Sequence, residues 1–457
     1  MDSYENIVEA QHRFFQTGAT RPLKWRLNAL KKLRHAIIRN EAAILDALQK
    51  DLGKNDFEAY ASETGIVLGE IRNAEKLARK YTSSNRIRTP LFLWPSRSSV
   101  LFEPLGVCLI IAPWNYPFQL ALAPLVDALA AGNCAVVKPS ERSVHTAAVI
   151  AQLLSETFSP EYVKTIIADR KDSARLLKQP FDKLFFTGSK AVGQIVYREA
   201  AEKMVPVTLE LGGKNPCIVM NDANIKAAAR RIVWGKFYNA GQTCVAPDYL
   251  LVHNDIAFDL LLALQTEITR QLGDDPRLCP YYGRLIDNIH LNRMTELLTD
   301  TMQVCGGDFD AETNYLAPTI VSDINWDHPL MADEIFGPIL PVITFDSLDD
   351  ALGKVQEIPK SLALYVFTRS STTRRKVIQT MRYGGGCIND TLVHFSSPYL
   401  SVGGVAASGI GQYRGLDGYR AFSNTKSIVQ TPHFPDLMLR YPPFAPWKTR
   451  LLKRLMK

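Results

Sequence analysis

The chain has 457 residues, of which 46% are hydrophobic and 22% charged. This composition is typical of a folded soluble protein of two or three domains, and it excludes a collagen-like, a disordered and a polytopic membrane protein. The formal net charge is +7, but residues 437–457 carry six Lys and Arg and no acid, which leaves +1 on residues 1–436. Such a neutral body argues against a nucleic-acid partner.

The cysteines and the N-terminus indicate the compartment. Seven cysteines, with no C-x-x-C pair, fit neither a disulfide framework nor a zinc site, so we expect no metal. The start, MDSYENIVEAQHRFF, is polar and acidic where a signal peptide needs a basic start and an apolar core. We expect a reducing, cytoplasmic location. Residues 105–137 are apolar, but three prolines interrupt them, so they predict a buried β-α-β unit and not a membrane span.

In chain order, the first 80 residues have a helical pattern, with Gly53 ending an amphipathic helix. Residues 82–101 are polar and broken by two prolines, which favours an arm or hairpin. Strands and helices then alternate: strands at 107–112, 134–138, 163–168, 183–186 and 207–210, and helices at 118–132, 143–158, 171–178 and 190–203. Ser143 is expected to cap the helix at 143–158. Short apolar strands between helices predict a parallel sheet covered on both faces.

A second α/β series restarts after Gly212-Gly213, so we expect a domain boundary near residue 210. Its predicted strands lie at 217–220, 249–253 and 362–368, and its helices at 224–239, 256–271 and 372–381. The chain is therefore expected to hold two parallel-sheet units.

One predicted strand ends in a glycine and leads directly into a helix. Phe186-Thr187-Gly188-Ser189 precedes a helix that contains Gly193, although the usual G-x-G-x-x-G is absent. Free N–H groups and the positive end of the helix dipole at this point suit a diphosphate. The alternative is an ordinary glycine turn before a capped helix.

The strand at 134–138 ends at Lys138, and Glu141 follows it, at the edge where open parallel sheets bind ligands. A lysine can donate to ribose hydroxyls, and a glutamate can accept from a 2′-OH while repelling a 2′-phosphate. The alternative is a solvated lysine and a helix-capping glutamate.

Three further residues could carry acyl chemistry. Cys244 follows a helix in N-A-G-Q-T-C-V-A-P, and an accessible thiol near a helix end or a bound cation is pushed toward thiolate. Glu210 ends an apolar strand, where burial would raise its pKa toward that of a general base. Asn115, in P-W-N-Y-P, offers an amide N–H to an oxyanion. The alternatives are an inert buried cysteine, an ion pair of Glu210 with Lys214, and an asparagine serving only its turn.

Six blocks follow one another along the chain: P-W-N-Y-P at 113–117, G-N-C-A-V-V-K-P-S-E at 132–141, F-T-G-S at 186–189, L-E-L-G-G-K-N-P at 209–216, G-Q-T-C-V-A-P-D-Y at 241–249 and E-I-F-G-P-I-L-P-V at 334–342. In order and spacing they resemble the signature blocks of the NAD(P)-dependent aldehyde dehydrogenase superfamily. The C-V-A-P-D-Y continuation resembles its class 3 branch, which includes fatty and aromatic aldehyde dehydrogenases. The resemblance covers about residues 5–430.

The resemblance implies a role for each matching residue. Cys244 would attack the aldehyde carbonyl, while Asn115 and the Cys244 backbone N–H would hold the oxyanion. Hydride would pass to the nicotinamide, and Glu210 would activate the water that hydrolyses the remaining thioester to the carboxylic acid. Further positions would contact the cofactor: Lys138 and Glu141 the adenosine ribose, Gly188, Ser189 and Gly193 the diphosphate, and Glu334 and Phe336 the nicotinamide ribose.

Pattern and resemblance together predict an α/β protein with a Rossmann-like parallel-sheet cofactor domain, a second α/β catalytic domain and a small bridging or oligomerisation arm. The expected division assigns residues 1–81 and 102–208 to the cofactor domain and 209–395 to the catalytic domain. Residues 82–101 and 396–430 form the bridging segments, and 431–457 a basic C-terminal tail. A homodimer is expected from the resemblance alone.

The substrate is expected to be an apolar aliphatic or aromatic aldehyde, because Trp, Tyr and Phe gather near the motifs. Glu141 favours NAD, with measurable use of NADP. A coenzyme A-acylating dehydrogenase and a non-catalytic binding protein on the same fold are the alternatives. Residues 400–409, LSVGGVAASG, lack a proline and an aromatic that class 3 relatives carry, so their acyl preference does not transfer directly. Cys134 is expected to be a small core residue.

Residues 447–457 predict an amphipathic basic helix. Its apolar face holds Leu451, Leu452, Leu455 and Met456, and its basic face Arg450, Lys453, Arg454 and Lys457. We expect peripheral contact with an anionic membrane surface. The alternative is a tail that packs on a partner subunit or stays in water.

Overall fold

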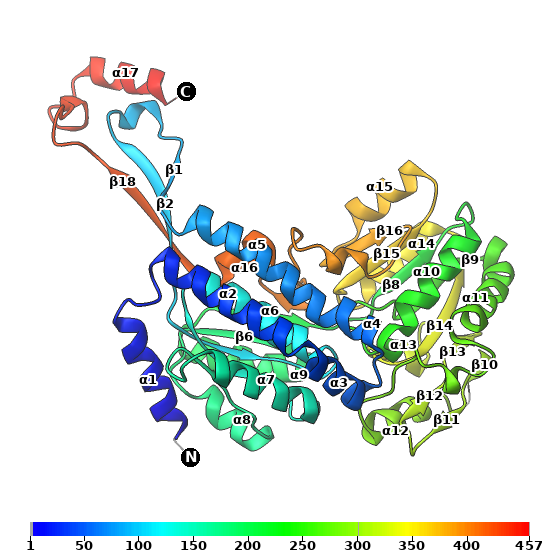
Figure 1. The fold of residues 1–457 in the computed structure, drawn as a ribbon. Coiled ribbons are helices and arrows are strands. Elements are labelled where there is room, and N and C mark those ends of the chain that lie inside the picture. Colours follow the sequence, from blue (N-terminus) through cyan, green and yellow to red (C-terminus); the bar gives the residue numbers. More distant parts are fainter. Residues whose placement is uncertain (1–2, 300, 457) are drawn as a thin grey trace.

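The computed structural model describes residues 3–299 and 301–456, and its first sheet has six strands, in the order β17-β7-β6-β3-β4-β5 (Figure 1). The strands are Gly409–Ile410 (β17), Val207–Leu211 (β7), Lys183–Gly188 (β6), Val107–Ile111 (β3), Cys134–Lys138 (β4) and Val163–Thr165 (β5). All are parallel except β17, which pairs antiparallel with β7. The five predicted strands of the first series are confirmed. Cys134 is fully buried in β4, as expected.

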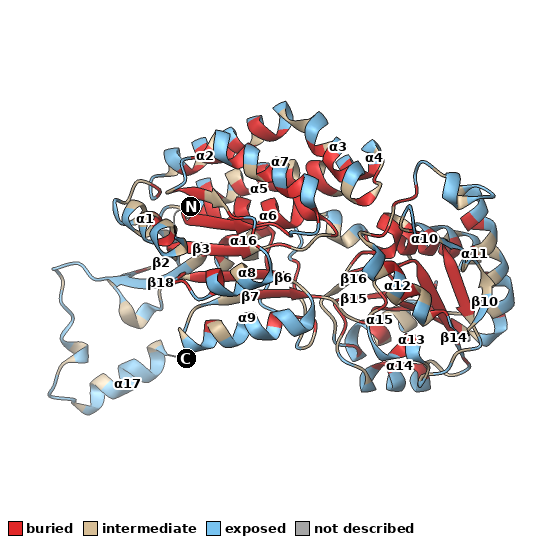
Figure 2. Cartoon of the chain, turned by 90° about the horizontal axis from the view of Figure 1, so that it is seen from below, coloured by how far each residue is buried: buried red, intermediate tan, exposed pale blue. Residues whose placement is uncertain are grey.

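Helices cover both faces of this sheet (Figure 2). On one side lie Leu23–Arg39 (α2), Glu41–Leu52 (α3), Gly65–Tyr81 (α5), Pro117–Ala131 (α6) and Val144–Thr157 (α7), and on the other Arg170–Leu177 (α8) and Lys190–Glu202 (α9). Every residue of α6 is buried, because α2 and α5 pack over it as an outer layer. The expected cap of α7 by Ser143 is wrong. The N–H groups of His145 and Thr146 donate instead to the carboxylate of Asp51, at the end of α3.

The second sheet has seven strands, in the order β10-β13-β14-β9-β8-β15-β16. They are Met302–Cys305 (β10), Thr319–Ser322 (β13), Ile339–Phe345 (β14), Tyr249–His253 (β9), Pro216–Val219 (β8), Ala363–Phe367 (β15) and Gly385–Ile388 (β16). Ile225–Phe237 (α10) and Ala257–Leu272 (α11) pack on one face, and Leu348–Glu357 (α14) and Ser371–Thr380 (α15) on the other. The predicted strands near 217, 249 and 362 are confirmed, whereas β10, β13, β14 and β16 were not predicted.

An arm extends from the first unit (Figure 1). Asn85–Ile87 (β1), Arg97–Pro104 (β2) and Ser423–Gln430 (β18) form an antiparallel sheet. This confirms the predicted arm at 82–101 and adds β18 to it. The helix Pro446–Leu455 (α17) packs beside the short helical turn Leu91–Leu93 (η2) on the arm, so the predicted tail helix is also confirmed. Lys457 lies outside the described residues.

The remaining elements complete the surface and the links. They are Tyr4–Gln16 (α1), Asp56–Ala59 (α4), Tyr60–Thr64 (η1, a π-helical turn), Tyr238–Gly241 (η3), Asn254–Ile256 (η4), Pro276–Leu278 (η5), Asn288–Leu297 (α12), Phe309–Asp310 (β11), Tyr315–Leu316 (β12), Pro329–Ala332 (α13), Val393–Ser396 (η6), Gly415–Ala421 (α16) and Met438–Arg440 (η7). The chain passes from the first to the second sheet between β7 and β8. Over the described part of the chain, no helix is both long enough and apolar enough to cross a bilayer.

Candidate active site

A strained turn places Cys244 between the two sheets. Three consecutive residues after α10, Asn239, Ala240 and Gly241, have positive φ values of 53°, 50° and 75°. A Cβ at Gly241 would collide with the backbone of Gly337, so only glycine fits there. The carbonyl of Cys244 accepts a hydrogen bond from Asn215 Nδ2 at 2.8 Å. The nucleophile candidate thus lies on a rigid, buried turn.

Two cavities meet at Cys244, which is half-buried. The first, of about 310 Å³, extends toward the carboxyl ends of β6 and β7, and its lining includes Asn115, Thr187, Gly188, Ser189, Glu210, Glu334 and Phe336. The second, of about 130 Å³, is largely apolar and aromatic, and its lining includes Ile66, Tyr116, Trp234, Tyr238 and Phe395. The cysteine therefore faces a polar cavity on one side and an apolar cavity on the other.

Asn115 lies in the loop between β3 and α6 and is 2% exposed. Its side-chain Nδ2 donates to the carbonyl of Gln242 at 2.9 Å, two residues before Cys244. An amide NH₂ group carries two hydrogens, so one N–H remains for a ligand in the first cavity. The fold brings this amide and the thiol together across a separation of more than a hundred residues.

Glu210 lies near the end of β7 and is 4% exposed. Neither carboxylate oxygen has a hydrogen-bond partner among the described residues, and burial raises the pKa of this carboxyl well above its usual value. The expected rise is confirmed. The alternative, an ion pair with Lys214, is wrong, because Lys214 Nζ contacts Asp248 at 2.5 Å and the Asp333 carbonyl at 3.0 Å.

The Cys244 thiol differs from the sequence expectation. Burial raises its pKa above the usual value, and the nearby carboxylates of Glu334 and Glu210 raise it further. The expected shift toward thiolate is therefore wrong for the protein groups around it, since the nearest charges are acidic. A nucleophilic attack from this position needs a base to take the thiol proton.

The positions expected at the diphosphate lie where β6 leads into α9. Ser189 lines the first cavity and makes no side-chain cap to α9, so the first N–H groups of this helix lack a capping partner. Thr187 Oγ1, also at this cavity, is buried without a hydrogen-bond partner within the described chain. Orphaned donors of this kind fit a diphosphate. Gly193 lies away from the cavity, where a Cβ would collide with Leu211 on β7, and so it permits close helix-to-strand packing.

Lys138 and Glu141 form an ion pair at the end of β4. Lys138 Nζ lies 2.5 Å from Glu141 Oε2, and the lysine side chain is 7% exposed, which excludes the solvated alternative. Burial alone would raise the pKa of Glu141, but the hydrogen bond and charge of Lys138 lower it overall. Neither residue lines the first cavity. Lys138 lies beside the end of β3, because β4 and β3 are parallel neighbours with Ile111 paired to Lys138.

Glu334 and Phe336 close the first cavity from the second unit. Gly212 has no side chain, and a Cβ there would collide with the Glu334 carboxylate, so the acid lies directly against the backbone of residue 212. Burial raises the pKa of Glu334 to about 8. Phe336 has a positive φ of 55°, and its ring meets Trp114 edge-on at a centroid distance of 5.4 Å. Such strain in a bulky residue is typical of a functional site.

Some residues of the two cavities were missed by sequence reasoning. His290 and Arg293 on α12 line the first cavity, and Ser62 and Ile66 line the second. None of these four residues lies within a recognisable motif, so no local signal marked them. Tyr116, one of the aromatic residues expected near the motifs, also lines the second cavity, and its hydroxyl pairs with Thr243 Oγ1 at 2.6 Å.

The fold and this site, in which two cavities share one cysteine, are those expected of a dinucleotide-dependent oxidoreductase. Residues 2–428 match the model of the aldehyde dehydrogenase family. The chain is 44% identical to 4,4′-diaponeurosporen-aldehyde dehydrogenase of Staphylococcus aureus, over 99% of this chain and all of the relative. It is 40% identical to human aldehyde dehydrogenase family 3 member B1, over 99% of this chain and 97% of the relative. The chain belongs to the aldehyde dehydrogenase family.

Solved structures agree. The substrate-bound state of Staphylococcus aureus AldH superposes with a TM-score of 0.97 at 43% identity, with all of both chains covered. Betaine aldehyde dehydrogenase of the same species, solved in complex with NAD⁺, has a TM-score of 0.84 at 26% identity over 96% of this chain and 88% of its own. The protein is an enzyme that oxidises an aldehyde to the carboxylic acid with a nicotinamide dinucleotide cofactor.

Proposed function

We propose that Cys244, Asn115 and Glu210 carry out this oxidation on an apolar aldehyde. The observation that supports the assignment best is that Cys244 lines both the polar and the apolar cavity. An aldehyde entering through the apolar cavity would reach the thiol from one side, and the cofactor would reach it from the other. The carboxyl group of Glu210 and the side-chain amide of Asn115 line the same polar cavity.

In the proposed mechanism, Glu210 takes the thiol proton and the Cys244 sulfur bonds to the carbonyl carbon. The negative charge on the oxygen is held by Asn115 Nδ2 and by the Cys244 backbone N–H, donors that are worth most where water is excluded. The nicotinamide ring, when bound, accepts the hydride. Once Glu210 has released that first proton to solvent, it removes a proton from the water that attacks the thioester. This proton returns to the sulfur as the carbon–sulfur bond breaks, which releases the acid and regenerates the Cys244 thiol.

The proposed cofactor contacts follow from the open groups at the site. Gly188, Ser189 and the first N–H groups of α9 would hold the diphosphate, Glu334 would accept from the nicotinamide ribose, and Phe336 would pack beside it. Gly193 would support this helix end. Lys138 and Glu141 would hold the adenosine ribose. Because the Glu141 carboxylate repels a 2′-phosphate, we propose NAD as the preferred cofactor, with measurable use of NADP.

The walls of the apolar cavity favour an aliphatic or aromatic substrate. Trp234 and Tyr238 lie with ring centroids 5.4 Å apart, and Phe395 and Leu392 complete the lining. The relative from Staphylococcus aureus is named for 4,4′-diaponeurosporen-aldehyde. An apolar chain or ring suits such a cavity better than a charged substrate does.

NADH formation at 340 nm tests the proposal with a series of aldehydes from C2 to C16 and benzaldehyde. We expect kcat/KM to rise with apolar chain length, the free acid to form without coenzyme A, and NAD to exceed NADP in kcat/KM. Cys244→Ser is expected to abolish turnover. A Cys244→Ser protein with the parent rate, or a preference for small polar aldehydes, would contradict the assignment.

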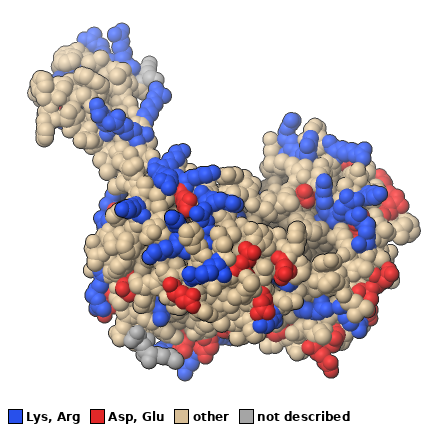
Figure 3. Space-filling model, viewed as in Figure 1, with Lys and Arg blue, Asp and Glu red and all other residues tan. Residues whose placement is uncertain are grey.

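We further propose that the protein is a cytoplasmic homodimer that touches anionic membranes through its tail. Helix α17 carries Lys and Arg side chains (Figure 3), and its apolar residues Trp447, Leu451 and Leu452 are exposed. A cationic helix with exposed apolar residues suits an anionic lipid surface. Exposed apolar residues on α9, among them Val192 and Ile195, favour contact with a second copy.

Liposome co-sedimentation in low salt tests the membrane contact. Deletion of residues 444–457 is expected to reduce the fraction bound to anionic vesicles, and partitioning unchanged by the deletion would contradict the tail assignment. Sedimentation equilibrium tests the dimer, for which a monomer at micromolar concentration is the contrary result.

We also propose that the domains follow the division expected from the sequence. In it, residues 1–81 and 102–208 bind the cofactor and 209–395 form the catalytic domain. Residues 82–101 and 396–430 form the bridging or oligomerisation segments, and 431–457 the basic tail.

A further inference from the structure

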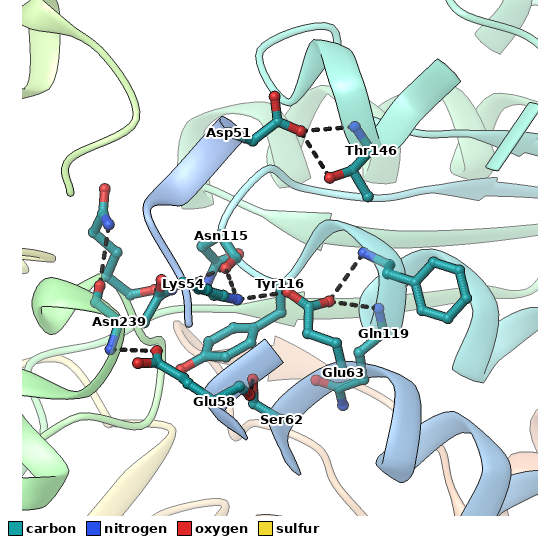
Figure 4. Close-up of polar contacts among 12 residues, drawn as sticks. Asp51, Lys54, Glu58, Ser62, Glu63, Asn115, Tyr116, Gln119, Thr146 and Asn239 are labelled. Atoms are coloured by element: carbon teal, nitrogen blue, oxygen red, sulfur yellow. Dashed lines mark hydrogen bonds and ion pairs between the residues drawn. The ribbon is translucent and has the colours of Figure 1, made fainter. Parts of the chain in front are cut away.

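A buried ion pair lies behind Asn115 (Figure 4). The side chains of Lys54 and Glu63 are 0% exposed, and Lys54 Nζ lies 2.5 Å from Glu63 Oε1. Lys54 Nζ also donates to the Asn115 carbonyl at 3.1 Å and lies 4.0 Å from the centre of the Tyr116 ring. The ammonium group of Lys54 therefore contacts the loop that carries Asn115.

Glu63 fixes the other end of the same loop. Its Oε2 accepts the N–H groups of Phe118 at 3.0 Å and Gln119 at 2.8 Å, which are orphan donors in the first turn of α6. The loop from Asn115 to the start of α6 is thus held at both ends by one ion pair. A carboxylate at a helix N-terminus also suits the positive end of the helix dipole.

Asn115 is held from a second direction as well. Asn239 Nδ2 donates to the Asn115 carbonyl at 2.8 Å, and the Asn115 side chain donates to the Gln242 carbonyl at 2.9 Å. The Asn115 carbonyl therefore accepts hydrogen bonds from both units, and one of the two side-chain amide hydrogens is bonded to the Gln242 carbonyl. Loss of the Lys54 donor leaves the carbonyl with one of its two partners.

A buried ion pair is weak as a source of stability. Removing two charges from water costs several kcal/mol for each ion, and replacement of such pairs by apolar residues is often neutral or stabilising. Here an apolar pair would orphan the first N–H groups of α6 and remove a donor from Asn115. The pair therefore serves mainly to fix the position of the loop that carries Asn115.

We propose that Lys54 and Glu63 are positioning residues that hold Asn115 so that its amide meets the oxyanion formed at Cys244. The proposal rests on the proposed role of Asn115. Neither residue touches the reacting atoms, and neither lines the two cavities that meet at Cys244. Both act through the backbone carbonyl of Asn115 and the first turn of α6.

The test compares two variants with different donors to Asn115. In Lys54→Met/Glu63→Gln the pair carries no charge, the glutamine oxygen can still accept from α6, and the donor to Asn115 is lost. We expect kcat to fall roughly 10- to 100-fold, less than the 100- to 1000-fold typical of losing an oxyanion donor outright. Glu63→Gln alone keeps the Lys54 donor to Asn115 but puts an NH₂ group where Oε1 faces the ammonium, so we expect its kcat to lie between those of the parent and of the double variant.

Two further measurements, the alkylation rate of Cys244 and the KM for NAD, distinguish a misplaced Asn115 from a general disturbance of the site. Alkylation of Cys244 by iodoacetamide forms no oxyanion, so its rate should match the parent in both variants, as should the KM for NAD. The exposed pair Lys50 and Asp46 on α3, just before Lys54, lies 2.6 Å apart and provides the matched control. Lys50→Met/Asp46→Asn is expected to leave kcat unchanged. A tenfold slower alkylation in the Lys54 variant would overturn the proposal, because it would show that the thiol site itself is disturbed.

A double-mutant cycle with Asn115→Ala tests the route of the effect. If Lys54 acts through the Asn115 amide, Lys54→Met/Glu63→Gln will cause no further loss of kcat in the Asn115→Ala background. Multiplicative losses, or a parent-like kcat in the Lys54 variant, overturn the proposal. A parent-like kcat in Asn115→Ala alone would refute the oxyanion role instead, so the two failures are distinguishable. If the double variant does not fold, Lys54→Met in the same cycle decides by the same criteria.

Discussion

Replacement of Glu334 by Gln is predicted to change how the stability of the protein depends on pH. Burial raises the pKa of this carboxyl from 4.5 to about 8, with a smaller contribution from Asp248. The hydrogen bond from Gly213 and the charges of Lys214 and Arg293 oppose this rise without cancelling it. The folded protein therefore keeps a proton that the unfolded chain releases near pH 4.5.

The sign follows from proton linkage. Because the pKa is raised on folding, the contribution of Glu334 to stability is fully present below pH 4.5 and is lost as the pH rises through about 8. At about 1.4 kcal/mol per pKa unit, the full shift would correspond to about 5 kcal/mol. Judged by its solvent-accessible surface, Glu334 is only half-buried. We therefore expect roughly 2–3 kcal/mol, since solvent screens a partly exposed charge.

Urea unfolding of the parent and Glu334→Gln at pH 5, 6, 7 and 8 measures this effect. Between pH 5 and pH 8, the free energy of unfolding of Glu334→Gln should rise by roughly 2–3 kcal/mol relative to that of the parent. Glu312→Gln, on the exposed turn after β11, controls for the loss of one carboxyl group. A difference that stays constant over this range, or that grows in favour of the parent, would refute the reasoning.

Three other predictions follow from the site and its supports. Glu210→Gln should lower kcat by roughly 10²–10⁴. The raised pKa of Glu210 makes the parent kcat increase with pH, and a pH profile of the variant that keeps this limb would contradict the role. Trp234→Ala should join the substrate cavity to a neighbouring cavity of about 310 Å³ that shares Trp234 and Tyr238, and kcat/KM for bulky aldehydes should rise at least roughly tenfold relative to acetaldehyde. An unchanged ratio would mean that the wall does not limit substrate size. Arg414→Met leaves Glu70, its partner at 2.6 Å, buried without a counter-charge, and should lower the free energy of unfolding by about 3–5 kcal/mol. A urea midpoint equal to that of the parent would exclude this contribution.

Local patterns predicted much of the fold. Strand β4, Cys134–Lys138, has the predicted bounds, and Gly53 ends α3 with a φ of 67°. Such features depend on neighbours in sequence, namely a run of apolar residues or one residue able to adopt a left-handed conformation. Strand β14 was missed. It lies in the middle of the second sheet although it contains Pro341, which lacks the N–H of a regular strand residue.

The candidate site was predicted in part. The chemical types of Cys244, Glu210 and Asn115 were visible in their motifs, and the structure brings them to one cavity. The protein groups alone do not give the expected shift toward thiolate, because burial and then the carboxylates of Glu334 and Glu210, which are distant in sequence, raise the pKa of Cys244. The pair of Lys54 and Glu63 left no signal in the sequence, since its partners in α6 lie more than fifty positions away.

The order of residues along the chain determined which groups are available, where strands alternate with helices, and which turns can form. Those properties arise between residues a few positions apart, where geometry is nearly independent of the rest of the protein. Only the tertiary structure decided the direction in which the pKa values of Cys244 and Glu210 shift, and which residues support Asn115. Desolvation and charge interactions depend on distance in space, and packing of the two sheets sets those distances.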